Sequence, residues 1–195
     1  MQRPTRKIPF SPPDISEAEI QEVTETLRSG WITTGPRTKQ LERELADWIG
    51  TEKCVCLSSQ TACAEMALRL LGIGKGDEVI VPAYTYTASA SVIDHVGAKI
   101  VMIDSQPDNL EMDYDAMEAA ITERTKAIIP VDLGGVPCDY ARIFEIVERK
   151  RNLFQPSNEI QRAIGRIAVC ADAAHALGAT WNGQIIGGIA DFSSF

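Results

Sequence analysis

Residues 76–87 read GDEVIVPAYTYT, a short apolar run that begins after a glycine and ends at a proline. Asp77–Val81 predicts a strand, and Thr87–Val96, which follows closely, predicts a helix. The intervening segment, Pro82–Thr87, therefore lies at the C-terminal end of a strand. In open α/β sheets this is the edge where ligands bind.

Short apolar runs and amphipathic stretches alternate along the rest of the chain in the same way. This order is typical of βαβ units, so we expect an α/β fold with three layers, α/β/α, and a mostly parallel mixed sheet. Further strands are expected at Lys53–Leu57, Ile100–Ile103, Ala127–Val131 and Ile167–Ala171. Further helices are expected at Ser16–Ser29, Thr38–Ile49, Gln60–Leu71, Tyr114–Ile121 and Tyr140–Arg151.

The last third of the chain adds a hairpin and an apolar end. Leu153–Arg166 is a polar connection with room for one helical turn, and Asn182-Gly183 is a strong hairpin signal. Phe192–Phe195 starts another apolar segment. Because domains normally end on a polar surface, we expect the sequence to be incomplete after Phe195.

The composition limits the classes of function. The 195 residues carry a formal net charge of −8, and 45% of them are hydrophobic, so a sizeable core can form. An acidic chain is not expected to bind nucleic acid, although a helix N-terminus can still hold a small anion. No apolar run approaches the roughly 18 residues of a membrane span, and Met1–Phe10 lacks the apolar region of a secretory signal. An odd number of cysteines, five, favours reduced thiols in the cytoplasm, and with two histidines and no CxxC spacing we expect no metal site.

Two segments have the chemistry to hold an anionic, planar ligand. Ser58-Ser59-Gln60-Thr61-Ala62 runs into a helix start, where backbone N–H groups and hydroxyls can cradle a phosphate. An ordinary Ser/Thr helix cap explains the same residues. Tyr86 follows a strand end and can stack on a planar ring, or it can simply cover the sheet end together with Tyr84.

An acidic residue follows another apolar run. Asp172 comes directly after Val169-Cys170-Ala171, and a buried acid needs a partner such as a protonated heterocyclic nitrogen. Alternatively, Asp172 caps the next turn and His175 is a core histidine. Together, a phosphate cradle, a stacking aromatic and an acid for a ring nitrogen describe a site for pyridoxal 5′-phosphate. No lysine follows this strand in the sequence, because the last lysine is Lys150.

The sequence resembles the DegT/DnrJ/StrS family of pyridoxal-phosphate sugar aminotransferases, which have fold type I. The resemblance covers nearly the whole chain and rests on Ser29–Pro36, Ser58–Ala62, Gly76–Pro82, Thr125–Val131 and Asp172–Ala176. It implies that residues 1–50 form an N-terminal helical segment with a substrate-side loop. It also implies that residues 51–195 form an incomplete cofactor-binding large domain, that a small C-terminal domain is absent, and that the protein is a homodimer.

The resemblance implies specific contacts with the cofactor. Ser59, Gln60 and Thr61 match the segment that binds the cofactor phosphate. Tyr86 matches the aromatic residue that stacks on the pyridine ring.

The resemblance also implies the catalytic and substrate-side residues. Asp172 matches the acid that pairs with the ring nitrogen, and His175 matches a polar residue beside the cofactor. Trp31 and Thr33 belong to a loop that matches a segment on the substrate side of the pocket. The Schiff-base lysine of the family lies a few residues past the motif that Phe192–Phe195 begins, outside the given sequence.

The implied reaction moves an amino group from a donor, usually glutamate, to a keto group of a nucleotide-linked sugar. Many members have His where this chain has Asp132, and Leu153–Arg166 is longer than usual, so these features are expected to mark a subgroup with its own substrate. Without the lysine, the 195-residue chain alone is expected to be inactive.

The same residues leave three alternatives to the aminotransferase. One is a sugar dehydratase of the same family, in which His replaces the lysine, and another is a non-catalytic truncated fragment. A nicotinamide-dependent Rossmann enzyme is set aside because no GxGxxG runs from a strand into a helix.

Overall fold

The computed structural model describes residue 9 and residues 12–195 of the chain. Within them, one sheet has five parallel strands in the order β2-β1-β3-β4-β7. Their bounds are β1 Glu78–Pro82, β2 Lys99–Ile103, β3 Thr125–Ile128, β4 Ala168–Asp172 and β7 Phe192–Ser194. Because every pair is parallel, the C-terminal ends of all these strands meet at one edge of the sheet.

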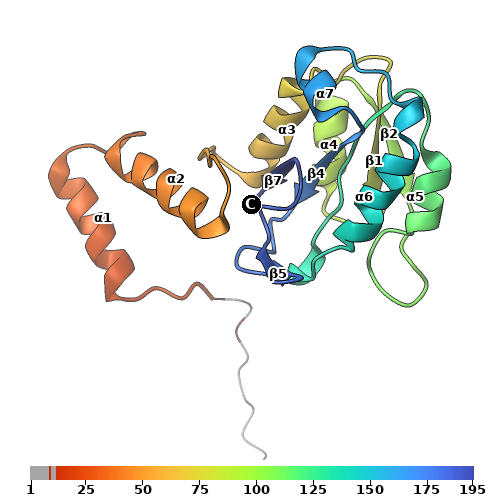
Figure 1. Ribbon diagram of the computed structural model, residues 1–195. Coiled ribbons are helices and arrows are strands. Elements are labelled where there is room, and N and C mark those ends of the chain that lie inside the picture. Colours follow the sequence, from red (N-terminus) through yellow and green to blue (C-terminus); the bar gives the residue numbers. More distant parts are fainter. Residues whose placement is uncertain (1–8, 10–11) are drawn as a thin grey trace, which may run out of the picture.

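Helices cover both faces of this sheet (Figure 1). Helices α3 (Gln60–Leu70) and α4 (Thr87–His95) lie on one face, and α5 (Tyr114–Ala120) and α6 (Tyr140–Arg149) lie on the other. The side chains of β1 alternate accordingly: Val79 and Val81 pack in the core beneath α3 and α4, and Ile80 packs with α5 and α6. The predicted three-layer α/β/α fold is confirmed.

Shorter elements connect these layers. Helix α7 (Glu159–Ile164) lies within the polar connection, where one helical turn was expected, and the single-turn helices η1 (Leu133–Gly135) and η2 (Arg151–Leu153) flank α6. The predicted hairpin forms from β5 (Thr180–Trp181) and β6 (Gln184–Ile185). Its turn holds Asn182 at φ 49°, a left-handed conformation that asparagine tolerates better than most residues.

Two N-terminal helices lie beside the sheet domain (Figure 1). Helix α1 (Glu17–Ser29) starts with the predicted capping box of Ser16 and Glu19 and has no buried residue. Helix α2 (Pro36–Ile49) contacts the sheet domain through its last turn, because Ile49 lies against Gly187. In the described part of the chain, no helix is both long and apolar enough to cross a membrane.

One predicted strand is wrong. Lys53–Leu57 is extended and its side chains alternate between half-buried and exposed, but it joins no strand of the described sheet. The backbone N–H of Cys56 instead donates to Glu42 Oε1 of α2 at 2.9 Å.

The strand expected at Ala127–Val131 begins earlier and ends at Ile128, although Val131 still forms an isolated parallel bridge with Asp172. The interpretation of Met1–Phe10 falls, apart from residue 9, outside the described residues.

Candidate active site

Asp172 ends β4 at the C-terminal edge of the sheet, and it is buried, with 6% of its surface exposed. Its backbone N–H donates to Pro130 O at 2.9 Å, and its carbonyl oxygen accepts from Asp132 N at 3.0 Å. On the other side, Asp172 pairs in register with Ser194 of β7. The main chain of Asp172 is therefore held by hydrogen bonds on one side and by pairing with β7 on the other.

Two hydroxyl groups stand behind the Asp172 carboxylate. Ser89 Oγ donates to Asp172 Oδ2 at 2.7 Å, and Thr85 Oγ1 lies 2.8 Å from Ser89 Oγ. Asp172 Oδ1 accepts only a longer bond, 3.3 Å, from Ala174 N. The cap on the following turn is therefore present, and Oδ1 keeps the capacity to accept a bond from a ligand N–H.

The start of α3 has the geometry of both a helix cap and an anion site. Ser59 is the N-cap, and its Oγ accepts from Ala62 N at 3.1 Å. The first backbone bond of the helix runs from Cys63 N to Ser59 O, so the N–H groups of Gln60 and Thr61 precede it. These N–H groups and the positive end of the helix dipole suit a phosphate.

Two consecutive hydrogen bonds link the start of α3 to the sheet edge where Asp172 lies. Gln60 Nε2 donates to Ser194 Oγ at 2.9 Å, and Ser194 Oγ donates to Ala171 O at 3.1 Å. Ala171 directly precedes Asp172. The predicted phosphate segment and the predicted acid therefore belong to one connected site.

His175 is exposed, so the interpretation of a core histidine is wrong. The backbone N–H of Gly134 donates to His175 Nδ1 at 3.2 Å. Because a backbone N–H can only donate, Nδ1 accepts and the neutral ring carries its proton on Nε2. His175 thus presents an N–H donor on the side away from Gly134.

Asp132 lies beside Asp172 and is 1% exposed. Its Oδ1 accepts from Cys138 N at 2.9 Å, and its Oδ2 accepts from Tyr140 OH at 2.8 Å. Burial raises the pKa of the Asp132 carboxyl, and these hydrogen bonds offset the effect only in part. Since protein donors use both of its oxygens, Asp132 holds the loop that carries Gly134.

Tyr86 is 80% exposed and occupies the position before the first residue of α4. It follows β1, which ends at the same edge as β4. Its ring is therefore accessible to a planar ligand at this edge, as expected of a stacking residue. Tyr84 is exposed as well.

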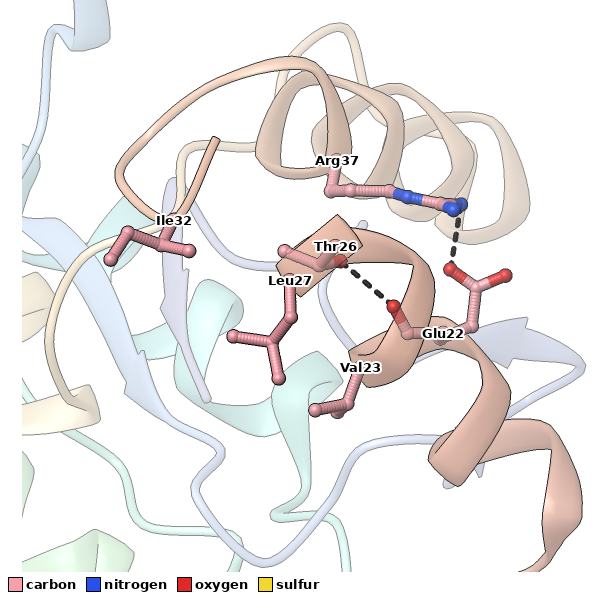
Figure 2. A pocket seen from close by; sticks show the side chains of 6 residues that line it. All are labelled: Glu22, Val23, Thr26, Leu27, Ile32 and Arg37. Atoms are coloured by element: carbon pink, nitrogen blue, oxygen red, sulfur yellow. Dashed lines mark hydrogen bonds and ion pairs between the residues drawn. The ribbon is translucent and has the colours of Figure 1, made fainter. Parts of the chain in front are cut away.

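The structure does not connect the predicted substrate residues Trp31 and Thr33 with Asp172. Trp31 Nε1 donates to Thr34 O at 3.1 Å, and the indole lies so close to Gly35 that a Cβ there would clash. Ile32, which stands between Trp31 and Thr33 in the sequence, lines a hollow of about 380 Å³ together with Val23 and Leu27 of α1 (Figure 2). Figure 2 also shows Arg37 bound to Glu22, so the cation at the rim of this hollow is already paired.

Two lysines of the sheet lie at its opposite edge. Lys99 begins β2 and Lys126 is the second residue of β3, and their ammonium groups bind Glu78 Oε1 and Gln155 O. Neither reaches the edge where Asp172 lies.

Ser89 and Thr85 were missed in the sequence. Thr85 follows a strand end and Ser89 lies in the first turn of the next helix, so two hydroxyl residues at this edge were a signal that could have been used.

A parallel sheet with a buried acid and a helix start at its C-terminal edge is a ligand-binding α/β architecture, and it agrees with the fold type I expected from the sequence. Residues 13–195 match the model of the DegT/DnrJ/EryC1/StrS aminotransferase family, and the chain belongs to this family.

Individual relatives agree with this assignment. The spore coat polysaccharide biosynthesis protein SpsC of Bacillus subtilis is 40% identical over the whole chain, which covers 46% of that protein. The UDP-4-amino-4-deoxy-L-arabinose–oxoglutarate aminotransferase of Shewanella sediminis is 42% identical over 92% of the chain, which covers 42% of that protein. This chain thus spans less than half the length of these relatives.

A solved structure is similar as well. The putative sugar aminotransferase Spr1654 of Streptococcus pneumoniae, in its PMP-form, is 62% identical, with a TM-score of 0.95 over 96% of this chain and 47% of that one. The same protein was also solved in a PLP-form. These comparisons agree with pyridoxal phosphate as the predicted cofactor.

Proposed function

We propose that this chain forms the cofactor-binding part of an aminotransferase that uses pyridoxal phosphate to aminate a keto group of a nucleotide-linked sugar, with glutamate as the amino donor. The observation that carries the proposal is the buried Asp172 carboxylate, which keeps one oxygen for a ligand N–H at the edge where α3 begins. Support for the sugar substrate comes from the family and from the aminotransferase relatives. The homodimer is proposed on the family resemblance.

Each residue at the edge has a task in this proposal. When bound, pyridoxal phosphate supplies an electron sink that lets a proton leave the amino-bearing carbon. Asp172 keeps the proton on the ring nitrogen, and the N–H groups at the start of α3 hold the phosphate. Tyr86 packs on the ring, and His175 offers Nε2–H to an oxygen beside it. Trp31 and Thr33 remain proposed substrate-side residues.

The domain division is part of the same proposal. Residues 51–195 carry the proposed cofactor contacts, and residues 1–50 carry the proposed substrate-side loop. The remaining length of the relatives is expected to supply the small C-terminal domain.

The donor half of the reaction tests the assignment without knowledge of the sugar. Glutamate added to the cofactor-loaded full-length protein, which is proposed to extend beyond the 195 residues, should change the cofactor absorption spectrum and release 2-oxoglutarate. Asp172→Asn should slow this step about 100-fold or more, because an amide cannot hold the ring-nitrogen proton. Asp94→Asn, at an exposed position of α4, is the matched control and should react like the wild type. Near wild-type turnover of a folded Asp172→Asn protein would refute the role of Asp172.

The sugar substrate has its own test. A nucleotide-linked keto sugar should be aminated, and the same sugar without its nucleotide should react much more slowly. Equal rates for the two would overturn the proposed substrate class.

A sugar dehydratase of the same family is kept as the second candidate, because no lysine of the described sheet lies beside Asp172 to show whether lysine or histidine anchors the cofactor. Product analysis separates the two: an aminotransferase yields an amino sugar, and a dehydratase yields a deoxygenated keto sugar. The 195-residue chain by itself is proposed to be inactive, and amino transfer by a chain of verified length would overturn that.

A further inference from the structure

The hydroxyls of the half-buried Thr85 and the buried Ser89 have a defined direction of donation. Ser89 is 1% exposed, and its single hydroxyl proton goes to Asp172 Oδ2. Because Ser89 has no second proton to give, the 2.8 Å contact is a bond in which Thr85 Oγ1 donates to Ser89 Oγ. The two hydrogen bonds therefore run in one direction: Thr85 donates to Ser89, and Ser89 donates to the Asp172 carboxylate.

We propose that Thr85 and Ser89 are positioning residues that orient the Asp172 carboxylate toward the ring nitrogen of the cofactor. The proposal rests on the proposed function. The bond from Ser89 fixes Oδ2, and it leaves Oδ1, whose contact with Ala174 N is 3.3 Å long, with capacity to accept a bond from a ligand. A carboxylate that accepts the Ser89 bond on Oδ2 can still accept an N–H from a pyridinium on Oδ1.

The position of these hydroxyls links two parts of the site. Thr85 and Ser89 flank Tyr86, the proposed stacking residue, in the sequence. The turn that presents Tyr86 is thereby bonded to the acid on a strand two places away in the sheet. Residues 85–89 thus set both the plane of the cofactor ring, through Tyr86, and the direction of its nitrogen, through Asp172.

The test compares two ligands that differ only at the ring nitrogen. Pyridoxamine phosphate and its 1-deaza analogue, which has a carbon in place of that nitrogen, bind without a covalent bond to the protein. Their dissociation constants are measured by equilibrium dialysis on the full-length protein for the wild type, Ser89→Ala, Thr85→Val, Thr85→Ser and Ser91→Ala. Ser91 is the control on the same helix, because its hydroxyl bonds only to Ala88 O.

We expect Ser89→Ala to bind pyridoxamine phosphate about 10- to 100-fold more weakly, since a hydrogen bond to a charged group is lost. Binding of the deaza analogue should change less than about twofold, because that ligand makes no bond to Asp172. Thr85→Val should show a smaller selective loss, which Thr85→Ser should restore, and Ser91→Ala should behave as the wild type. If Ser89→Ala does not fold, the Thr85 pair decides.

Equal weakening of both ligands would show a merely structural role and overturn the proposal, and so would unchanged binding of both. The wild type can prefer pyridoxamine phosphate over the deaza analogue while Ser89→Ala and Thr85→Val keep the same preference. That result would overturn the positioning role of Thr85 and Ser89 but not the role of Asp172. A wild type that binds neither ligand would overturn the proposed function as well.

Discussion

Glu78→Gln is expected to destabilise the protein by removing a buried charge that several donors satisfy. Glu78 begins β1 and is 2% exposed. Its Oε2 accepts from Thr122 Oγ1 at 2.6 Å. Its Oε1 accepts from Arg124 Nη2 at 2.8 Å and from Lys99 Nζ at 3.1 Å. Glutamine keeps the shape of the side chain but not its charge.

The magnitude follows from the pKa of Glu78. Burial raises this pKa, but hydrogen bonds from Thr122, Arg124 and Lys99 outweigh burial and lower it from 4.5 to about 2. That difference corresponds to about 3 kcal/mol of stability at pH 7. Because the Arg124 and Lys99 side chains are 62% and 67% exposed, solvent screening makes this an upper value.

The pH dependence has a definite sign. The pKa of Glu78 is lower in the folded than in the unfolded state, so the stabilisation is complete above about pH 5 and is lost as the pH falls toward 2. About three-quarters of this stabilisation remains at pH 4 and less than half at pH 3. The difference between wild type and Glu78→Gln should shrink accordingly.

Urea unfolding of both proteins at pH 7, 4 and 3 measures this difference. Glu145→Gln is the control, because Glu145 forms an exposed ion pair with Arg149 and its loss should cost less than about 0.5 kcal/mol. A Glu78→Gln effect that stays constant from pH 7 to pH 3 would refute the charge-based reasoning. So would an effect at pH 7 no larger than that of the control.

Three further substitutions test the surroundings of the site. Tyr140→Phe removes a donor from the buried Asp132 carboxylate and should lower the free energy of unfolding by about 1–3 kcal/mol in urea titrations; no loss would contradict the bond. Ser59→Ala removes the N-cap of α3 and should cost about 1 kcal/mol in the same assay, whereas Ser59→Asn should restore most of it. Gly135→Ala places a Cβ on a backbone at φ 80° and 2.9 Å from His175 O. We therefore expect a lower melting temperature and a shifted His175 ring resonance by NMR. A wild-type melting curve would refute the strain.

The layers of the fold were predictable because their signals are local. Strands β1, β2 and β4 contain short apolar runs that a helix precedes or follows, and Asn182-Gly183 marks its turn by its own conformation. Lys53–Leu57 shows the limit of such signals. The alternation along this segment indicates one half-buried side, but the sequence does not show that Glu42, rather than a strand, satisfies its backbone.

The site was predictable where a residue ends an element and was missed where it depends on distant contacts. Asp172 follows an apolar strand, so its burial could be inferred from its neighbours. Ser89 acquires its partner only because two segments 83 positions apart meet in the folded chain. The bond between Tyr140 and Asp132 likewise depends on how the loop before α6 closes, which no periodicity describes.

The place of β7 in the sheet has a consequence for how the protein is made. Strands β1 to β4 pair among themselves, whereas Gln60 reaches β4 through Ser194, which leaves the ribosome more than a hundred residues later. Domains fold as their segments emerge, N-terminal parts first. A nascent chain can therefore assemble most of its sheet before the α3 start is tied to the Asp172 edge, so capture of the cofactor is expected only after β7 has joined the sheet.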